Sequence, residues 1–192
     1  MEGKFYIKSS DNNKNDIEYC LYDDSTLMSP YNFGNYELLL GDGYHISIGI
    51  DKEKKQCLSI ICLLDAWSFE NRKINFSPVD DIQYDLMYIS SNMLKESGEH
   101  YVPFVEKCYC DFEKSILAFG DIYENGKIIS FNNNSFAKLN NDKLLAVFIK
   151  VSDDVISYIK SKKIKKDFSF LQDNSYFYHH DDHYNVMPSV FF

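Results

Sequence analysis

Four runs of apolar residues follow one another between residues 115 and 151, and turn-forming asparagines separate them. Asn125-Gly126 lies between the first two runs, and this pair favours a type I′ hairpin because both positions of that turn need positive φ. In KLLAVFIKV, alternate apolar side chains point to opposite faces of a strand, so both faces need covering. The pattern predicts an antiparallel meander over 115–151, with strands near 116–124, 127–131, 135–139 and 143–151.

Two other segments show helical signals. Ser77-Pro78 offers an N-cap and a first-turn proline, and apolar residues then recur at helical spacing up to Gly98, which can end the helix. Ser152 likewise precedes two acidic residues, an apolar stripe and a lysine-rich end, an order that complements the helix dipole. These signals predict main helices at about 78–97 and 153–165.

Shorter patterns complete the predicted fold. Ile46, Ile48 and Ile50 alternate with small residues as in a strand that buries one face, and CLSIICLL is apolar on both faces. A chain of 192 residues is long enough to bury a sizeable core in one domain. We therefore expect a single α+β domain over residues 1–192, with a largely antiparallel sheet and two main helices.

Charge and cysteine content limit the possible functions. The formal charge is −9, from 20 basic and 29 acidic residues, which argues against a nucleic-acid partner and suits a basic protein, although acidity can also serve solubility alone. The N-terminus has no apolar targeting segment, and no apolar run reaches the length of a membrane span. Together with an odd number of cysteines, five, these features favour a cytoplasmic protein with reduced thiols and no membrane partner.

Few residues suggest catalysis. His179, Asp181 and His183 have side chains that bind zinc, but a solvated polar loop is the simpler interpretation, since no further ligand pair or catalytic glutamate accompanies them. Cys62 with His45 as a base would form a nucleophile pair, yet no third group would orient the base, and a core cysteine is favoured. We expect no cofactor and no enzymatic activity; a metal-dependent enzyme that uses the histidine cluster stays an alternative.

The predicted helix at 78–97 carries a candidate partner-binding surface. With its apolar stripe inward, Asp81, Tyr84, Asp85 and Tyr88 fall together on the opposite flank. Tyrosine supplies rigid contact area and carboxylates attract a basic partner, although an ordinary solvated face explains the same pattern. A second acidic site is 181–182, where Asp181 and Asp182 adjoin.

The region KCYCDFEKSILAFGDIYENGKIISFNNNSFAKLNNDKLLAVFIKV, together with the acidic composition, resembles the immunity proteins of polymorphic bacterial toxin systems of the contact-dependent inhibition type. The resemblance implies a non-enzymatic inhibitor that binds a cognate toxin, often a basic nuclease, and blocks its active site or its access to substrate. A structural or assembly protein is a further alternative.

Overall fold

The computed structural model describes residues 5–9, 18–22, 25–29, 34–41, 43, 45–75, 85–90, 93–94, 101–105 and 107–172. The chain divides into two compact units, Met1–Ile159 and Lys160–Phe192. The first unit contains all the described strands, and the described part of the second is the later part of a helix. That the chain is one domain over residues 1–192 stays a prediction.

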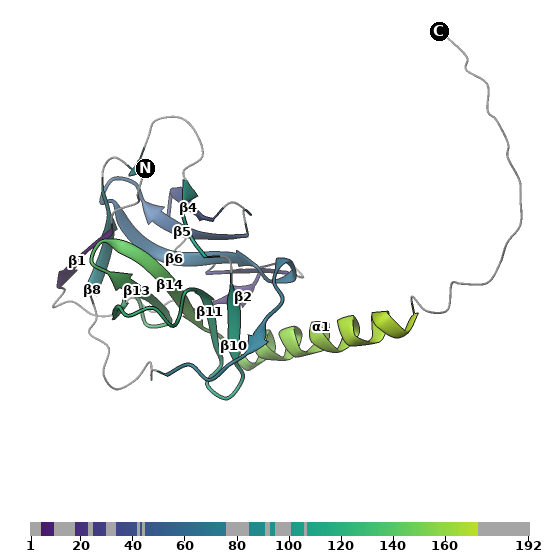
Figure 1. Ribbon diagram of the computed structural model, residues 1–192. Helices are drawn as coiled ribbons and strands as arrows, with labels where there is room; N and C mark the ends of the chain where they lie inside the picture. Colours follow the sequence, from purple (N-terminus) through teal and green to yellow (C-terminus); the bar gives the residue numbers. More distant parts are fainter. Residues whose placement is uncertain are drawn as a thin grey trace, which may run out of the picture. The chain divides into compact units, whose positions relative to one another are not determined.

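The described residues form two largely antiparallel sheets, one 3₁₀ helix and one α-helix (Figure 1). Sheet A has the order β1-β8-β6-β5-β4-β9, with β3 also pairing β6 and β2 pairing β3. Sheet B has the order β12-β13-β14-β11-β10-β7. The elements are β1 (Phe5–Ser9), β2 (Cys20–Leu21), β3 (Thr26–Met28), β4 (Tyr36–Leu40), β5 (Ile46–Asp51), β6 (Gln56–Leu63), η1 (Leu64–Ala66), β7 (Glu70–Asn71), β8 (Asp85–Ile89), β9 (Tyr101–Val102), β10 (Cys108–Asp111), β11 (Ile116–Gly120), β12 (Lys127–Ser130), β13 (Ser135–Asn140), β14 (Lys143–Lys150) and α1 (Asp153–Gln172).

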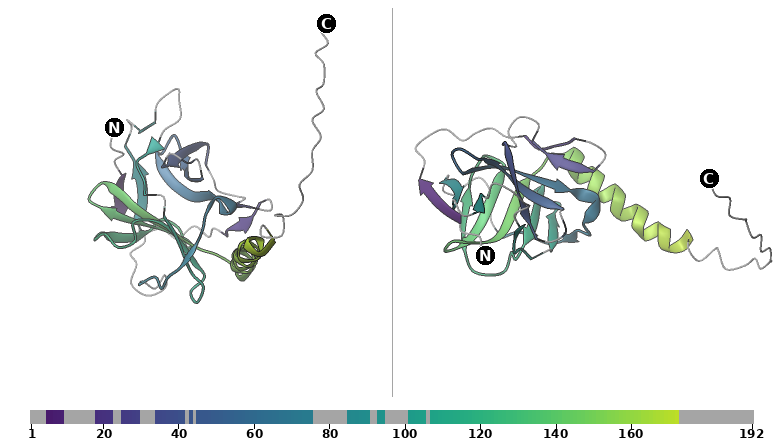
Figure 2. Two further views of the ribbon diagram at one scale, coloured as in Figure 1. Left: turned by 45° about the vertical axis from the view of Figure 1, so that its right-hand side comes forward. Right: turned by 90° about the horizontal axis from the view of Figure 1, so that it is seen from above.

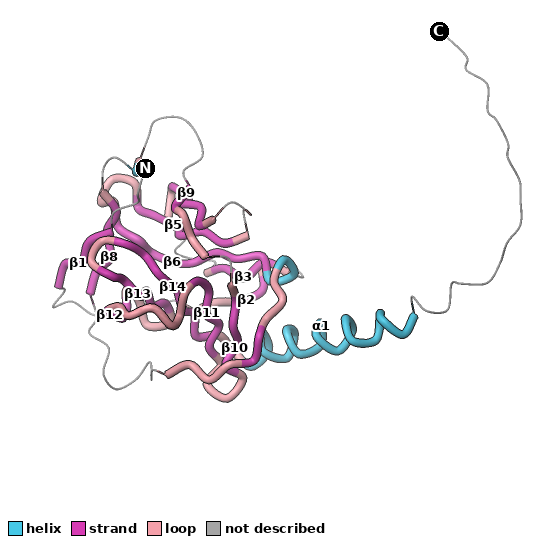
Figure 3. Tube along the Cα trace, viewed as in Figure 1, coloured by secondary structure: helices cyan, strands magenta, loops and turns pink. Residues whose placement is uncertain are grey.

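The largely antiparallel architecture is confirmed, and strands dominate the first unit (Figure 3). Within sheets A and B, only the short edge strands β9 and β7 pair in parallel, with β4 and β10 respectively. The hairpin β5-β6 turns at Asp51, whose carboxylate accepts the N–H groups of Glu53 and Lys54. Asp111 closes the hairpin β10-β11 in the same way. An aspartate that bonds its own turn explains why both polar loops reverse the chain within four residues.

The predicted meander is correct for three of its four strands. β12, β13 and β14 are consecutive antiparallel neighbours, joined by the two asparagine turns that the sequence indicates. β11, however, pairs with β14 and not with β12. The four strands therefore have a Greek-key order, in which the chain crosses from one side of the group to the other between β11 and β12.

The predicted type I′ turn at Asn125-Gly126 is wrong. Neither residue has a positive φ, whereas that turn requires positive φ at both positions. Gly126 instead allows close packing, since an added Cβ would lie 2.7 Å from the carbonyl oxygen of Leu139 and 3.1 Å from a methyl carbon of Leu145. The glycine is needed for this close approach in the connection, not for a tight hairpin.

The predicted helix at 78–97 is also wrong where the structure describes it. Residues 85–89 form strand β8, which pairs with β1 in the register Phe5↔Ile89 to Ser9↔Asp85. Asp85, Met87 and Ile89 are buried and Tyr88 between them is partly exposed, so burial follows a period of two. A buried aspartate at one inward position hides this strand pattern from a count of apolar residues.

The second predicted helix is confirmed and is longer than expected. α1 begins at Asp153 and ends at Gln172, so the lysines between 160 and 166 lie in its middle and its last turn contains no basic residue. In the first unit, Val155, Ile156 and Ile159 pack into the main core, as predicted for a helix that covers a sheet. The sequence has no glycine or proline that would end the helix at residue 165.

The main core lies between sheets A and B, and the left view of Figure 2 shows these sheets as two layers. Inward residues of both sheets meet there, including Leu38, Ile48, Ile60, Phe119 and Val147. A second buried cluster on the other face of sheet B contains Phe136 and Phe148, which are cross-strand partners. The expectation that the last strand of the meander needs cover on both faces is therefore confirmed.

Candidate partner-binding surface

Asp85, expected on an exposed helical face, lies in the interior with 1% of its side chain exposed. Its Oδ2 lies 3.1 Å from Nζ of Lys127 on β12, so the ion pair links an edge region of sheet A to sheet B. Oδ1 is buried and has no hydrogen-bond partner among the residues that the structure describes. Removing one member of such a pair leaves a buried charge uncompensated, which indicates a structural role for this carboxylate.

Tyr88 lies on the outward face of sheet A, beside its register partner Tyr6 on β1. The two rings are stacked, with centroids 5.4 Å apart and planes 12° from parallel. Nζ of Lys8 lies 4.8 Å from the centroid of the Tyr88 ring, within the range of a cation–π contact. Tyr88 therefore belongs to an outward aromatic pair whose close charged neighbour is basic.

The remaining predicted site residues lie outside the described residues: Asp81, Tyr84, His179, Asp181, Asp182 and His183. Within the described ranges, no group of three or more histidine, cysteine, aspartate or glutamate residues is placed to hold a metal ion. No described helix is both long and apolar enough to cross a membrane.

The cysteines are free thiols, and all except Cys20 are buried. Burial raises the pKa values of the Cys57 and Cys62 thiols well above their usual range, because the interior disfavours a thiolate. A nucleophile needs its thiolate at neutral pH, so these two residues are core cysteines. His45 contacts the edge of the Trp67 ring, with centroids 5.9 Å apart.

A buried tyrosine joins the two sheets. The hydroxyl of Tyr19 accepts the backbone N–H of Ile60 on β6 at 2.8 Å and shares a short hydrogen bond with the hydroxyl of Ser135 on β13. Nearby, the side-chain amide of Asn132 donates to the carbonyl oxygen of Leu58 at 2.8 Å. Burial raises the pKa of Tyr19 to about 12, so the phenol is neutral and acts as a structural link.

The outward face of sheet A is unusually apolar near the hairpin β2-β3 and the end of β6. The outward side of an antiparallel sheet that faces water is normally polar. Here the alternation that buries Leu27, Leu38 and Cys62 turns a set of partly or fully exposed apolar side chains outward: Cys20, Tyr22, Met28, Leu39, Ile61 and Leu63. Apolar surface of this kind marks interaction sites more often than scattered single residues do.

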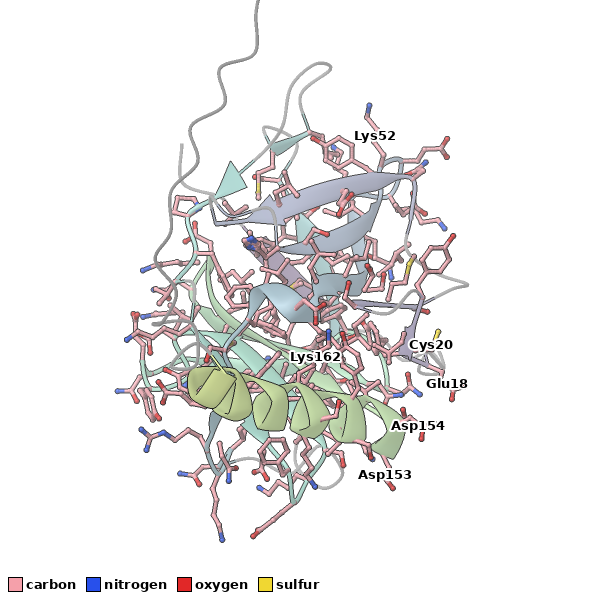
Figure 4. The ribbon with its side chains drawn as sticks, turned by 90° about the vertical axis from the view of Figure 1, so that its right-hand side faces the viewer. Glu18, Cys20, Lys52, Asp153, Asp154 and Lys162 are labelled. Carbon is pink, nitrogen blue, oxygen red and sulfur yellow. The ribbon has the colours of Figure 1, made fainter. Side chains whose placement is uncertain are left out.

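Acidic side chains accompany this apolar surface. Glu18 precedes β2 and is exposed, and Figure 4 shows it next to Cys20. Asp65 in η1 is exposed and accepts the hydroxyl proton of Tyr158 at 2.7 Å. Glu37 on β4 is exposed and accepts a hydrogen bond from Ser47. No lysine or arginine occupies a described outward position of β2, β3, β4 or β5, so this end of the face is locally acidic.

This surface could not be predicted from local sequence, because its residues come from four separate segments. In comparisons with known proteins, no family model matches the chain. No curated protein and no solved structure is significantly similar to it either.

Proposed function

We propose that this protein is a cytoplasmic binding protein that inhibits a basic protein partner, in the manner of an immunity protein that neutralises a toxin. The observation that carries the proposal is the apolar outward face of sheet A, with acidic side chains beside it. Apolar contact area supplies affinity, and carboxylates around it attract a positively charged partner and speed its association.

The chemistry of the described residues supports binding over catalysis. The thiols with shifted pKa values are protonated, and the hydroxyl of Tyr19 is held in the core by hydrogen bonds to both sheets. The ion pair of Asp85 with Lys127 joins strands of different sheets. Each of these groups has a structural explanation, whereas the outward apolar side chains have none within the described fold.

The distribution of charge favours a local interaction surface. Of the 29 acidic and 20 basic residues, 15 and 17 respectively lie within the described ranges, so net charge alone does not make the described surface acidic. A basic partner would therefore recognise a place where carboxylates and apolar side chains occur together, not the described surface as a whole.

Co-expression tests the proposal. The product of the adjacent reading frame is produced alone and together with this protein, and cell growth and co-purification are measured. We expect that the adjacent product arrests growth, that this protein restores growth, and that the two proteins purify as a complex at low ionic strength. An adjacent product that is harmless, or that remains toxic without forming a complex, would contradict the proposed function.

A further inference from the structure

The outward residues around Leu63 form a continuous row across three strand segments of sheet A, those of β2, β3 and β6. Leu63 pairs with Thr26 on β3, and the N–H of Tyr22 donates to the carbonyl oxygen of Thr26 at 2.8 Å. On the other side, the N–H of Leu63 donates to the carbonyl oxygen of His45 at 2.9 Å. Directly paired residues of an antiparallel sheet present their side chains to the same face, so the outward row, named the Leu63 row, consists of Tyr22, Thr26 and Leu63. The His45 ring instead lies against Trp67, which packs on Phe119 of the main core.

The Leu63 row holds two of the most exposed large apolar side chains in the described structure. Tyr22 is 71% exposed and Leu63 is 40% exposed, whereas the neighbouring inward residues Leu27 and Cys62 are buried to within 1%. Outward neighbours in the preceding row, Met28 and Ile61, are half-buried and also apolar. A partner that covered the Leu63 row would remove apolar surface from water on several adjacent strands at once.

The charges near the Leu63 row define the chemistry of that partner. Asp65 follows Leu63 by two residues, and its hydrogen bond with Tyr158 holds the carboxylate beside the first turns of α1. Glu18, four residues before Tyr22 in the same hairpin, is exposed. The Tyr6–Tyr88 pair at the other end of the sheet has Lys8 over it instead, so it suits a basic partner less well.

We propose that the Leu63 row is the docking surface for a basic protein partner, which places an apolar side chain against Leu63 and Tyr22 and lysine or arginine side chains near Asp65 and Glu18. This inference rests on the proposed inhibitory function and adds the surface and the recognition chemistry. Apolar anchors at the centre of an interface carry most of its affinity, while charges at its rim act on the association rate.

Two variants of matched exposure test the surface. Leu63→Lys removes the apolar anchor and adds a repelling charge, and Tyr6→Lys makes the same kind of change at a position that is 39% exposed, against 40% for Leu63. The probe is the purified product of the adjacent reading frame, titrated against the full chain. Because a buried anchor contributes about 2 kcal/mol, we expect Leu63→Lys to weaken binding about 30-fold and Tyr6→Lys to weaken it by no more than about twofold.

Asp65→Asn tests the electrostatic contribution to binding of the basic partner. Asparagine keeps an oxygen that can accept the Tyr158 hydroxyl proton but removes the charge, so we expect slower association, weaker salt dependence and unchanged thermal stability. Equal binding by Leu63→Lys and wild type would overturn the proposed surface while the inhibitory function stands. No complex with the wild-type protein would overturn both.

Other occupants of the surface give distinguishable results. In the free chain, carbodiimide labelling is expected to modify Glu18 and Asp65, and protection of both in the monomer would mean that the chain itself covers the surface. Light scattering is expected to give a monomer, and a dimer that Leu63→Lys dissociates would mean that a second copy occupies it. Either result would overturn the docking of a basic partner at this place.

Discussion

Replacing Tyr19 by phenylalanine tests the link between the two sheets. The change removes only the hydroxyl, which accepts the N–H of Ile60 at 2.8 Å and bonds the hydroxyl of Ser135. The ring stays and fills the same volume, so no large cavity forms. The change in the free energy of unfolding then reports the loss of a partner for two buried polar groups, the N–H of Ile60 and the hydroxyl of Ser135.

The expected loss follows from the burial of those groups. A buried donor or acceptor without a partner is less favourable by about 1–3 kcal/mol. Ser135 is fully buried, and the Ile60 N–H points into the space that the hydroxyl leaves. We expect Tyr19→Phe to lower the free energy of unfolding by about 2–4 kcal/mol at pH 7, a large part of the 5–15 kcal/mol typical of a folded protein.

The same residue predicts a difference at high pH. Burial raises the pKa of Tyr19 from 10.0 to about 12, so between these values the unfolded chain releases a proton that the folded chain keeps. The contribution of Tyr19 is fully present below pH 10 and is lost as the pH rises toward 12. The wild type should therefore lose about 2–3 kcal/mol more than Tyr19→Phe across this window.

Urea denaturation followed by far-UV circular dichroism measures both effects. Tyr22→Phe is the control, because it removes a hydroxyl from a side chain that is 71% exposed, and we expect it to match the wild type within about 0.5 kcal/mol. A loss below about 0.5 kcal/mol for Tyr19→Phe, with an unchanged denaturant slope, would refute the role of this hydroxyl. If the free energies of unfolding of the wild type and Tyr19→Phe fell in parallel between pH 10 and pH 12, burial would not raise the pKa of Tyr19 as described.

Three further changes test the packing. Gly120→Ala should lower the free energy of unfolding by more than about 1 kcal/mol in urea titrations, because φ is +101° and the new Cβ would meet the Leu145 carbonyl oxygen and lie 2.6 Å from Phe104; a neutral effect would contradict this geometry. Phe148→Ala should lower the free energy of unfolding by about 3–5 kcal/mol in the same titrations. A loss of less than about 1 kcal/mol would mean that the buried cluster around Phe148 is loosely packed. With a maleimide at neutral pH, Cys20 should react quickly and the four buried thiols only on unfolding, whereas several fast thiols in the native protein would contradict their burial.

Local patterns predict the fold where pairing is local. The two asparagine turns that join β12, β13 and β14 are visible in the sequence because each connects neighbouring strands directly. β11 is misplaced by such reasoning, since two strands, β12 and β13, separate it along the chain from its partner β14. The Asn125-Gly126 dipeptide is a strong hairpin signal, but neither residue adopts the positive φ of that turn, and Gly126 lies too close to the Leu139 carbonyl to carry a side chain.

The failure at β8 has a longer-range cause. Ile82, Leu86, Ile89 and Met93 recur at helical spacing, yet Asp85 takes an inward strand position. Its charge is compensated by Lys127, which lies 42 residues away in sequence. No local rule assigns an aspartate to the interior without knowledge of that partner.

The candidate surface cannot be recognised from the sequence, because its residues are also far apart along the chain. Tyr22, Thr26 and Leu63 come together only through the pairing of β2 with β3 and of β3 with β6. Taken separately, each is an ordinary exposed or half-buried residue. The acidic composition does predict a basic partner, and only the structure offers a place where apolar and acidic side chains meet.

The association rate, measured at several salt concentrations, shows whether charge guides the partner to this protein. Stopped-flow fluorescence follows the binding of the adjacent reading frame's product to this protein between low and physiological ionic strength. We expect the association rate to fall steeply with salt and the dissociation rate to change little, because carboxylates attract a basic partner and apolar contacts hold it. An association rate independent of salt would contradict the claim that this acidic protein recognises its partner by charge.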